Sequence, residues 1–332
     1  MKKCSFILVG CGRIGKRHAE EISRVGTLVA VCDTDIGKAR CFGEQYNVPF
    51  FGSLNETLKS GLITDFASIC TPNGLHASQT IACFNHGLHV ICEKPMAIKS
   101  EDCRTMIREA TKMKRKLFVV KQNRFNPPVL AAKKKIDEGA FGKIFNMQLN
   151  CFWNREPTYY DDPWRGTIDM DGGTLFTQFS HFIDLMYWFM GDVAEVRVLR
   201  KNFTHKDVIA FEDTGVVVLE FSSGAIGTIN YTVNAYAKNM EGSLTLFGEN
   251  ATIKIGGEYL NRIDYAEGVQ LDVTGDTTLP NDYGSYKGSM SNHDKVYDHI
   301  LDVMNNPVLE ILSVYDAMKT VEIIERVYEV GS

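Results

Sequence analysis

A lysine and a glycine-rich turn are the parts of this chain best suited to catalysis. Lys94 follows an apolar, strand-like segment, Leu88–Cys92, within the sequence LHVICEKP. Upstream, FILVGCGRIGKRH (residues 6–18) has the pattern of a strand, a glycine turn and the start of a helix. Because ligands of doubly wound sheets bind beyond the carboxyl ends of the strands, the turn and Lys94 should lie at one edge of a sheet. An ionisable amine beside a nucleotide cofactor indicates a dehydrogenase.

The glycine turn has the GxGxxG spacing of a dinucleotide-binding loop, with Gly10, Gly12 and Gly15. These glycines would permit a tight turn, close approach of the backbone to a pyrophosphate, and packing of the helix on the strand. Asp33 ends the next predicted strand, 18 residues after Gly15, near the spacing of about 20 expected for a ribose-binding acid. An acid here favours NAD over NADP, although Lys38 and Arg40 leave NADP open. Without a cofactor, the glycines would serve only the turn.

Three other positions are candidates for the same chemistry. The loop Thr71–Pro72–Asn73 should line the cofactor, although Asn73 could equally cap the following helix. Lys94 could be a surface charge paired with Glu93, but a lysine partly desolvated beside a cationic nicotinamide should have a lowered pKa, which suits acid–base catalysis. His181, with Asp184 one helical turn further on, is a second acid–base candidate; a buried core histidine is the alternative.

The elements that must position these residues indicate an α/β protein of two domains. Residues 1–121 alternate strand and helix patterns, which predicts a Rossmann domain with a parallel sheet. Its predicted strands are Phe6–Val9, Leu28–Cys32, Phe66–Cys70, Leu88–Cys92 and Leu117–Val120. Residues 122–332 should form an α+β domain for substrate binding and oligomerisation.

The second domain should contain a mostly antiparallel sheet. After a helix that begins at Pro127 and Pro128, strand patterns separated by glycine-bearing turns run from about Ile144. The sequence FTQFSHFIDLMYWFMG interrupts them as one helix that ends at Gly191. Two terminal helical segments, NHDKVYDHILDVMNN and SVYDAMKTVEIIERVYEV, could pack back on the first domain.

Composition narrows the possible partners and compartment. The net charge of −5 gives no reason to expect nucleic acid or an acidic membrane surface. No apolar run approaches the roughly 20 residues that span a bilayer. Lys2, Lys3 and the apolar residues after them resemble a signal segment, but that stretch is short and cleavage at Cys11 would cut the glycine turn. The nine cysteines lack CxxC spacing, so we expect no metal site and a cytoplasmic protein.

Together these motifs resemble the Gfo/Idh/MocA oxidoreductases over essentially the whole chain. The shared motifs are the glycine turn, the TPN loop, EKP, Trp164–Arg165, the helix with His181 and Asp184, and EDTG at Glu212–Gly215. The resemblance implies that Lys94 and His181 act on a substrate hydroxyl during hydride transfer, and that the Lys94–Pro95 bond is cis. Thr177 stands where many members have an aspartate, and a third glycine is missing after Gly172–Gly173. These differences argue against an inositol-type catalytic triad.

The strings KQNRFNPP, CFWNRE, DGGTLFTQFSHFIDLMYW and GGEYLNRIDY are similar to one branch, the UDP-N-acetylglucosaminuronate 3-dehydrogenases of bacterial surface polysaccharide (lipopolysaccharide O-antigen) synthesis. This resemblance implies NAD-dependent oxidation of a 3-hydroxyl. The expected cofactor contacts are Gly10, Gly12, Arg13, Ile14, Gly15, Asp33, Thr71, Pro72, Asn73, His76, Glu93, Lys94, Gln122, Trp164 and Arg165. The expected substrate contacts are Lys94, Lys121, Asn123, Arg124, Thr177, Gln178 and His181. Arg124 suits a carboxylate, although it could be an ordinary helix-start charge.

Other functions are also compatible with these motifs. A dehydrogenase of a free sugar or inositol, or an NAD-dependent glycosidase, would use the same fold. A dinucleotide-sensing regulator is the non-enzymatic alternative, against which Lys94 and His181 argue. We also expect a homodimer or homotetramer, because an apolar open sheet face would suit an interface between copies.

Overall fold

The computed structural model describes residues 3–275, 279–282, 287–306 and 312–330. The chain divides into two compact units: residues 1–120 with 293–318, and residues 121–292 with 319–332. The sequence suggested a boundary after residue 121, with terminal helices that could pack back on the first domain; residues 293–318 group with the first unit.

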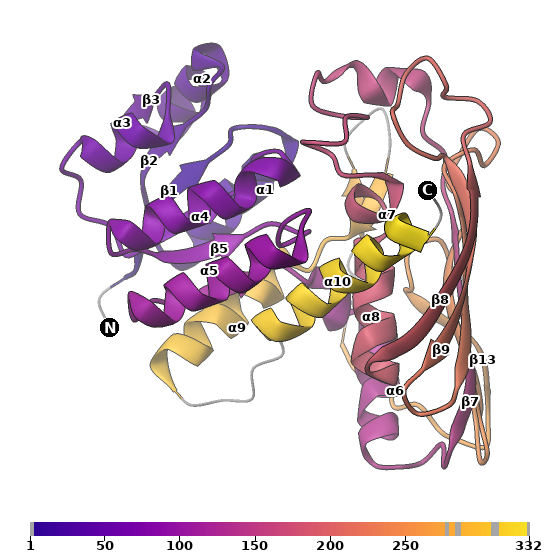
Figure 1. Cartoon of the computed structure of the whole chain (residues 1–332). Coiled ribbons are helices and arrows are strands. Elements are labelled where there is room, and N and C mark those ends of the chain that lie inside the picture. The colour runs from indigo at the N-terminus through magenta and orange to yellow at the C-terminus, as the bar shows by residue number, and fades with distance from the viewer. Residues whose placement is uncertain (1–2, 276–278, 283–286, 307–311, 331–332) are drawn as a thin grey trace. The chain divides into compact units, whose positions relative to one another are not determined.

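A six-stranded parallel sheet forms the centre of the first unit (Figure 1). Its order is β3-β2-β1-β4-β5-β6, typical of a Rossmann fold. The strands are β1 (Ser5–Val9), β2 (Thr27–Cys32), β3 (Phe50–Phe51), β4 (Phe66–Ile69), β5 (His89–Cys92) and β6 (Leu117–Val119). Five of them were predicted. The sixth, β3, is a two-residue edge strand, too short to leave a periodic pattern.

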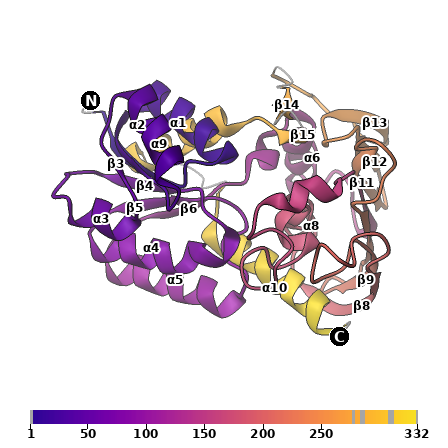
Figure 2. The same cartoon turned by 90° about the horizontal axis from the view of Figure 1, so that it is seen from above.

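The helices of this unit pack on the sheet or on one another, mostly through small and apolar residues. They are α1 (Arg13–Val25), α2 (Ile36–Tyr46), α3 (Leu54–Lys59), α4 (His76–Asn85), α5 (Ser100–Lys112) and α9 (His293–Asn305), with the 3₁₀ turn η1 (Asn73–Leu75). α4 and α5 run side by side in both views (Figures 1 and 2). α1 buries Gly15, His18, Ala19 and Ile22, a helical i, i+3, i+4, i+7 stripe that places His18 in the interior. α9 packs on α1.

A seven-stranded sheet forms the centre of the second unit, in the order β13-β12-β11-β7-β10-β9-β8. Its strands are β7 (Ile144–Phe152), β8 (Val193–Lys201), β9 (Thr214–Phe221), β10 (Ile226–Thr232), β11 (Glu241–Gly248), β12 (Thr252–Gly256) and β13 (Arg262–Glu267). The neighbouring strands are antiparallel except for β7 and β10, which pair in parallel, so the sheet is mostly antiparallel, as predicted. A separate pair joins β14 (Pro280–Asp282) to β15 (Lys287–Met290). Figure 1 shows α8 lying against one face of the large sheet.

The helices of the second unit include one departure from the sequence prediction. They are α6 (Pro127–Asp137), α7 (Thr174–Thr177), α8 (Ser180–Met190) and α10 (Val314–Val330), with 3₁₀ turns η2 (Gln122–Phe125) and η3 (Pro157–Asp161). The single helix predicted over residues 176–191 is wrong. Phe179 has a non-helical backbone (φ −118°, ψ 7°), which separates α7 from α8. Among the described residues, no helix is long and apolar enough to cross a membrane.

Candidate active site

The glycine turn of the first unit has the geometry of a dinucleotide-binding loop. Gly10 follows β1 with φ +97°, and a Cβ there would lie 2.6 Å from the Cys70 carbonyl oxygen. A Cβ on Gly15 would lie 2.1 Å from the Gly10 carbonyl oxygen. Gly12, by contrast, faces open space and is the N-cap residue of α1, with no side chain to occupy the helix amino end. The helix terminus therefore presents N–H groups to an anion, which fits the pyrophosphate of NAD. Arg13 and Ile14 form the first turn of α1.

Asp33 at the end of β2 is tied to this turn. One carboxylate oxygen accepts a hydrogen bond from the Cys11 N–H (2.8 Å), and the other accepts one from the Asp35 N–H (2.8 Å). A carboxylate has about four acceptor positions, so both oxygens keep capacity for the hydroxyls of a ribose. Lys38, which left NADP open, lies 3.7 Å from Asp35 in an exposed ion pair.

The loop Thr71–Asn73 leaves β4 at the same edge of the sheet. Asn73 begins η1, directly before α4; the N-cap residues of η1 and α4 are Pro72 and Leu75, so Asn73 is not at the capping position considered for it. His76, the first residue of α4, is fully buried. Its Nδ1 lies 2.7 Å from the Pro95 carbonyl oxygen and its Nε2 lies 2.9 Å from the Thr71 carbonyl oxygen. Both ring nitrogens thus contact the protein, so His76 holds the loop rather than offering a ring nitrogen to a cofactor.

Lys94 follows β5 and is half-buried, and the Lys94–Pro95 bond is cis, as the resemblance implied. Glu93 does not form the surface pair considered for it. Its carboxylate is buried and lies 2.9 Å from His18 Nε2 and 3.4 Å from His293 Nε2. Its other oxygen accepts a hydrogen bond from the Lys94 N–H (3.0 Å). The Glu93 side chain therefore points inward, and a cofactor contact at this position would have to come from its backbone.

Glu93 is ionised in this setting. Burial opposes its ionisation, but hydrogen bonds from His18 and His293 outweigh that effect and hold its pKa well below the usual value. Burial lowers the pKa of His18, so this ring donates as a neutral imidazole. His18 was missed from the sequence; the signal that could have found it is its place on the buried stripe of α1.

In the second unit, Lys121 and Arg124 bind an internal carboxylate. Arg124 Nε and Nη2 lie 2.7 and 2.8 Å from the two oxygens of Asp184, and Lys121 Nζ lies 2.8 Å from one of them. All three side chains are buried. Burial opposes ionisation of Asp184, but the charges of Arg124 and Lys121 outweigh it and lower its pKa to about 2. The bidentate contact that we expected between Arg124 and a substrate carboxylate is thus made to Asp184. Asp184, named above only as a neighbour of His181 on the same helix, thus binds these two cations.

The segment that follows β6 also carries two buried amides. Asn123 is 1 % exposed, and neither its amide nitrogen nor its oxygen has a hydrogen-bond partner among the described residues. The side-chain oxygen of Gln122 likewise has none. Buried polar groups are rarely left without partners, so these amides are suited to a ligand.

Thr177 and Gln178 lie in a second polar cluster. The Thr177 hydroxyl donates to the buried carboxylate of Asp171, which also accepts from the Gly166 N–H (2.8 Å). Burial raises the pKa of Asp171 to about 6 in spite of these bonds. Gln178 accepts from Arg155 Nε (2.7 Å) and donates to the Tyr159 hydroxyl (2.8 Å). Arg155 and Asp171 were missed because nothing in their local sequence distinguishes them.

The remaining predicted residues of the second unit lie near these clusters in sequence. His181 is 3 % exposed on the first turn of α8, three residues before Asp184. Arg165 pairs with Asp162 (3.1 Å) and lies over the ring of Tyr159 at 4.0 Å from its centroid. Trp164 precedes it and is half-buried.

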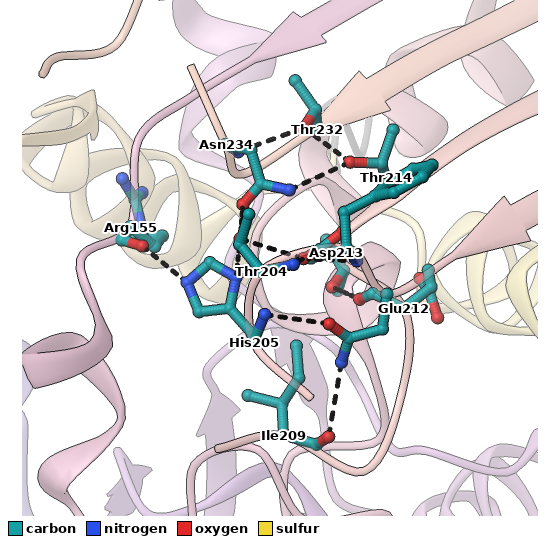
Figure 3. A network of polar contacts seen from close by, with 12 residues as sticks. Arg155, Thr204, His205, Ile209, Glu212, Asp213, Thr214, Thr232 and Asn234 are labelled. Atoms are coloured by element: carbon teal, nitrogen blue, oxygen red, sulfur yellow. Dashed lines mark hydrogen bonds and ion pairs between the residues drawn. The ribbon is translucent and has the colours of Figure 1, made fainter. Parts of the chain in front are cut away.

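A further network fixes the backbone of Arg155 (Figure 3). Asp213 accepts hydrogen bonds from the N–H groups of Phe203 and Thr204 (3.1 and 2.9 Å), and lies 3.2 Å from His205 Nδ1. The other nitrogen of the His205 ring lies 2.9 Å from the Arg155 carbonyl oxygen. This network anchors the arginine that holds Gln178.

Comparison with known proteins agrees with this geometry. Residues 4–121 match the family model "Oxidoreductase family, NAD-binding Rossmann fold", and residues 129–254 match the "GFO/IDH/MocA C-terminal domain". The WlbA dehydrogenase from Chromobacterium violaceum, solved with NADH and UDP-GlcNAcA, is 33% identical over 99% of this chain and 94% of its own, with a TM-score of 0.89. The chain belongs to the Gfo/Idh/MocA oxidoreductase family.

Two other proteins are also similar to this chain. The WlbA dehydrogenase from Bordetella pertussis, also solved with NADH and UDP-GlcNAcA, is 33% identical over 99% of this chain and 96% of its own, with a TM-score of 0.86. Myo-inositol 2-dehydrogenase from Thermotoga maritima is 28% identical over 67% of this chain and 66% of that protein, slightly less than two thirds of its length.

Membership of the Gfo/Idh/MocA family confirms three predictions: the Rossmann domain, the NAD cofactor and an NAD-dependent dehydrogenase. The glycine turn and Asp33 fit that cofactor sterically and by their hydrogen-bonding groups.

Proposed function

We propose that this chain oxidises the 3-hydroxyl of a UDP-N-acetylated hexuronate, UDP-N-acetylglucosaminuronate, in the synthesis of a bacterial surface polysaccharide. The observation that carries the proposal is the 33% identity, over 99% of the chain, to a dehydrogenase solved with NADH and UDP-GlcNAcA. Thr177, in place of the aspartate common in the family, supports a substrate other than inositol.

NAD⁺, when bound, supplies the hydride acceptor. In this proposal the amine of Lys94 takes the proton of the 3-hydroxyl while the hydrogen on C3 leaves as hydride, so that a C=O bond forms. His181 orients the hydroxyl or relays its proton. The reverse assignment, with His181 as base and Lys94 as the orienting group, uses the same atoms.

The polar side chains of the second unit supply the proposed sugar contacts. Asn123 is the strongest candidate, because its buried amide can both donate and accept. Thr177 uses its hydroxyl hydrogen on Asp171, so its oxygen would accept from the sugar. Gln178 retains one N–H and one lone pair beyond its bonds to Arg155 and Tyr159. Lys121 and Arg124 act in this scheme through Asp184, by fixing the start of the segment that carries Asn123.

A dehydrogenase of a free sugar or inositol is the second candidate, supported by the 28% identity to the inositol enzyme. An NAD-dependent glycosidase would release a free sugar without net NADH. A dinucleotide-sensing regulator would bind NAD and turn over no sugar. Each alternative therefore gives a different product.

The proposed quaternary state is a dimer or tetramer of this chain in which the open face of the large sheet packs on a second copy. Side chains with substantial exposure on β8, β9 and β10 include Leu199, Val216, Val218 and Ile226. Light scattering coupled to size-exclusion chromatography tests this proposal, and a monomer across the working concentration range would contradict it.

The test of function is mass-spectrometric analysis of purified protein incubated with NAD⁺, 2-oxoglutarate and UDP-N-acetylglucosaminuronate. UDP-N-acetylglucosamine and myo-inositol run in parallel. The ketoacid allows a tightly held NADH to be reoxidised. We expect loss of two hydrogens from the uronate alone. Oxidation of inositol alone would favour the second candidate, and NAD binding without any product would favour the regulator.

A further inference from the structure

The backbone on both sides of Lys94 is held by buried side chains. Before it, the Lys94 N–H donates to the Glu93 carboxylate (3.0 Å). After it, the Pro95 carbonyl oxygen lies 2.7 Å from His76 Nδ1. Glu93 is 5% exposed and His76 is fully buried, so both side chains are almost inaccessible to a substrate.

Glu93 is in turn fixed by two helices. His18 on α1 lies 2.9 Å from its carboxylate, and His293, the first residue of α9, lies 3.4 Å from the same oxygen. Behind His18, the Ser68 and Tyr297 hydroxyls lie 2.7 and 2.9 Å from Nδ1. With Nε2–H donating to Glu93, Nδ1 accepts from these hydroxyls, and the ring is fully satisfied.

His76 connects the same turn to a second loop. Its Nε2 contacts the Thr71 carbonyl oxygen at 2.9 Å, in the loop before α4. The buried contacts thus join three segments at the carboxyl edge of the sheet: α1 after the glycine turn, the loop Thr71–Asn73, and Lys94–Pro95. The sequence singled out each segment separately, but nothing in it showed that side chains connect them.

We propose that Glu93 and His76 are positioning residues for Lys94, an inference that rests on the proposed role of Lys94. They fix the Glu93–Lys94 peptide before it and the Pro95 carbonyl after it, and so the point from which its side chain extends. A reacting group displaced by about 1 Å can lose about 10²-fold in rate. Their loss should therefore lower kcat and leave substrate KM and NAD affinity nearly unchanged.

His18, Glu93 and His293 also have the composition of a metal site, since their ligand atoms lie within 4.8 Å of one another. Hydrogen bonding accounts for the cluster as it stands. The 2.9 Å separation of His18 and Glu93 is an N–H···O distance, and the remaining nitrogen of His18 has hydroxyl partners. Metal analysis of the purified protein distinguishes a hydrogen-bonded cluster from a metal site.

The first arm of the test compares Glu93→Ala with Glu93→Gln by hydrogen–deuterium exchange and steady-state kinetics. A glutamine keeps one carbonyl oxygen for the Lys94 N–H, and its NH₂ can donate to His18 in the other tautomer. We expect exchange at Lys94 to be about tenfold faster in Glu93→Ala and near wild type in Glu93→Gln. We expect kcat to fall about 10²-fold in Glu93→Ala and to recover largely in Glu93→Gln. The exposed Glu101→Ala is the matched control, with no change expected.

The second arm is His76→Leu, which keeps the proposal testable if Glu93→Ala does not fold. It removes both carbonyl contacts, so kcat should fall at least about tenfold with NAD affinity retained. The exposed His86→Leu on the same helix is its control. Unchanged exchange and kcat in both Glu93→Ala and His76→Leu would overturn the proposal. Equal kcat losses in Glu93→Ala and Glu93→Gln, or one equivalent of bound metal, would also overturn it.

Lys94→Ala separates this inference from the proposed function. If that variant keeps wild-type turnover, the catalytic assignment of Lys94 fails, whatever the exchange data show. If turnover is lost in Lys94→Ala but unaffected in Glu93→Ala and His76→Leu, the proposed function stands and the positioning role fails.

Discussion

The two units each bury a carboxylate beside a predicted catalytic residue, and they stabilise it by different means. In the first unit Glu93 accepts hydrogen bonds from two histidine rings and from a backbone N–H. In the second unit Asp184 lies between a guanidinium and an ammonium group. Both carboxyls have lowered pKa values. Replacing Glu93 therefore removes the acceptor of several hydrogen bonds, whereas replacing Asp184 removes a negative charge from beside two buried cations.

The largest effect follows from that difference. Asp184→Asn should lower the free energy of unfolding by about 3–5 kcal/mol, because it removes the negative charge that lies 2.7–2.8 Å from the buried cations Arg124 and Lys121. Urea denaturation followed by tryptophan fluorescence measures it. Asp192→Asn is the control: Asp192 is 57% exposed and pairs with Lys319, so the change should stay below about 1 kcal/mol. Equal losses of unfolding free energy in both variants would contradict the stronger contribution assigned to the buried Asp184.

Replacing Lys94 in the first unit should affect catalysis more strongly than it affects stability. Lys94→Ala should lower kcat by about 10³-fold, since it removes the proposed acid–base group. NAD affinity, measured by titration calorimetry, should stay within about threefold, because the glycine turn and Asp33 are untouched. The exposed Lys99→Ala should leave both quantities at wild-type values. Loss of NAD binding in Lys94→Ala would assign Lys94 to the cofactor instead.

The two units also differ in how much of their candidate sites the sequence could predict. Strand ends, the glycine turn and Asp33 lie in local patterns, and the parallel topology brings them to one edge. The partners of Lys121 and Arg124 are about 60 residues away in sequence, and no local pattern records such a pairing. Helical periodicity along α1 is enough to place His18 on a buried face, although it was not used for that, and it does not identify Glu93 as the partner. The break at Phe179 was missed because the apolar pattern runs through it.

Asp171 provides a pH test within the second unit. Its pKa rises from 3.8 to about 6 on folding, so the folded protein binds this proton more tightly than the unfolded chain. The stabilisation is complete below about pH 4 and is lost as the pH rises through 6, by about 3 kcal/mol. As the pH rises from 4.5 to 7.5, the free energy of unfolding should therefore fall less in Asp171→Asn than in the wild-type protein. Glu212, whose pKa is also raised to about 6, titrates in both proteins and cancels in the comparison. Parallel pH curves for the two proteins would contradict the burial effect.

The smallest effect concerns the choice of cofactor in the first unit. Asp33→Asn should weaken NAD binding and shift the NAD/NADP preference by about tenfold, because the charge that repels a 2′-phosphate is removed. Calorimetric titration with both cofactors measures this shift. Asp35→Asn, at the N-cap of α2, should leave the preference unchanged, since asparagine also caps helices. An unchanged preference in Asp33→Asn would place cofactor selection elsewhere.

The central claim is that hydride leaves C3 of the sugar, and isotope transfer tests it most directly. UDP-N-acetylglucosaminuronate carrying deuterium at C3 would be incubated with the protein and NAD⁺, and the bound and released nicotinamide analysed by mass spectrometry. The account predicts reduced cofactor one mass unit heavier than that from unlabelled sugar. Unlabelled NADH, or an intact labelled sugar beside NAD-loaded protein, would contradict it.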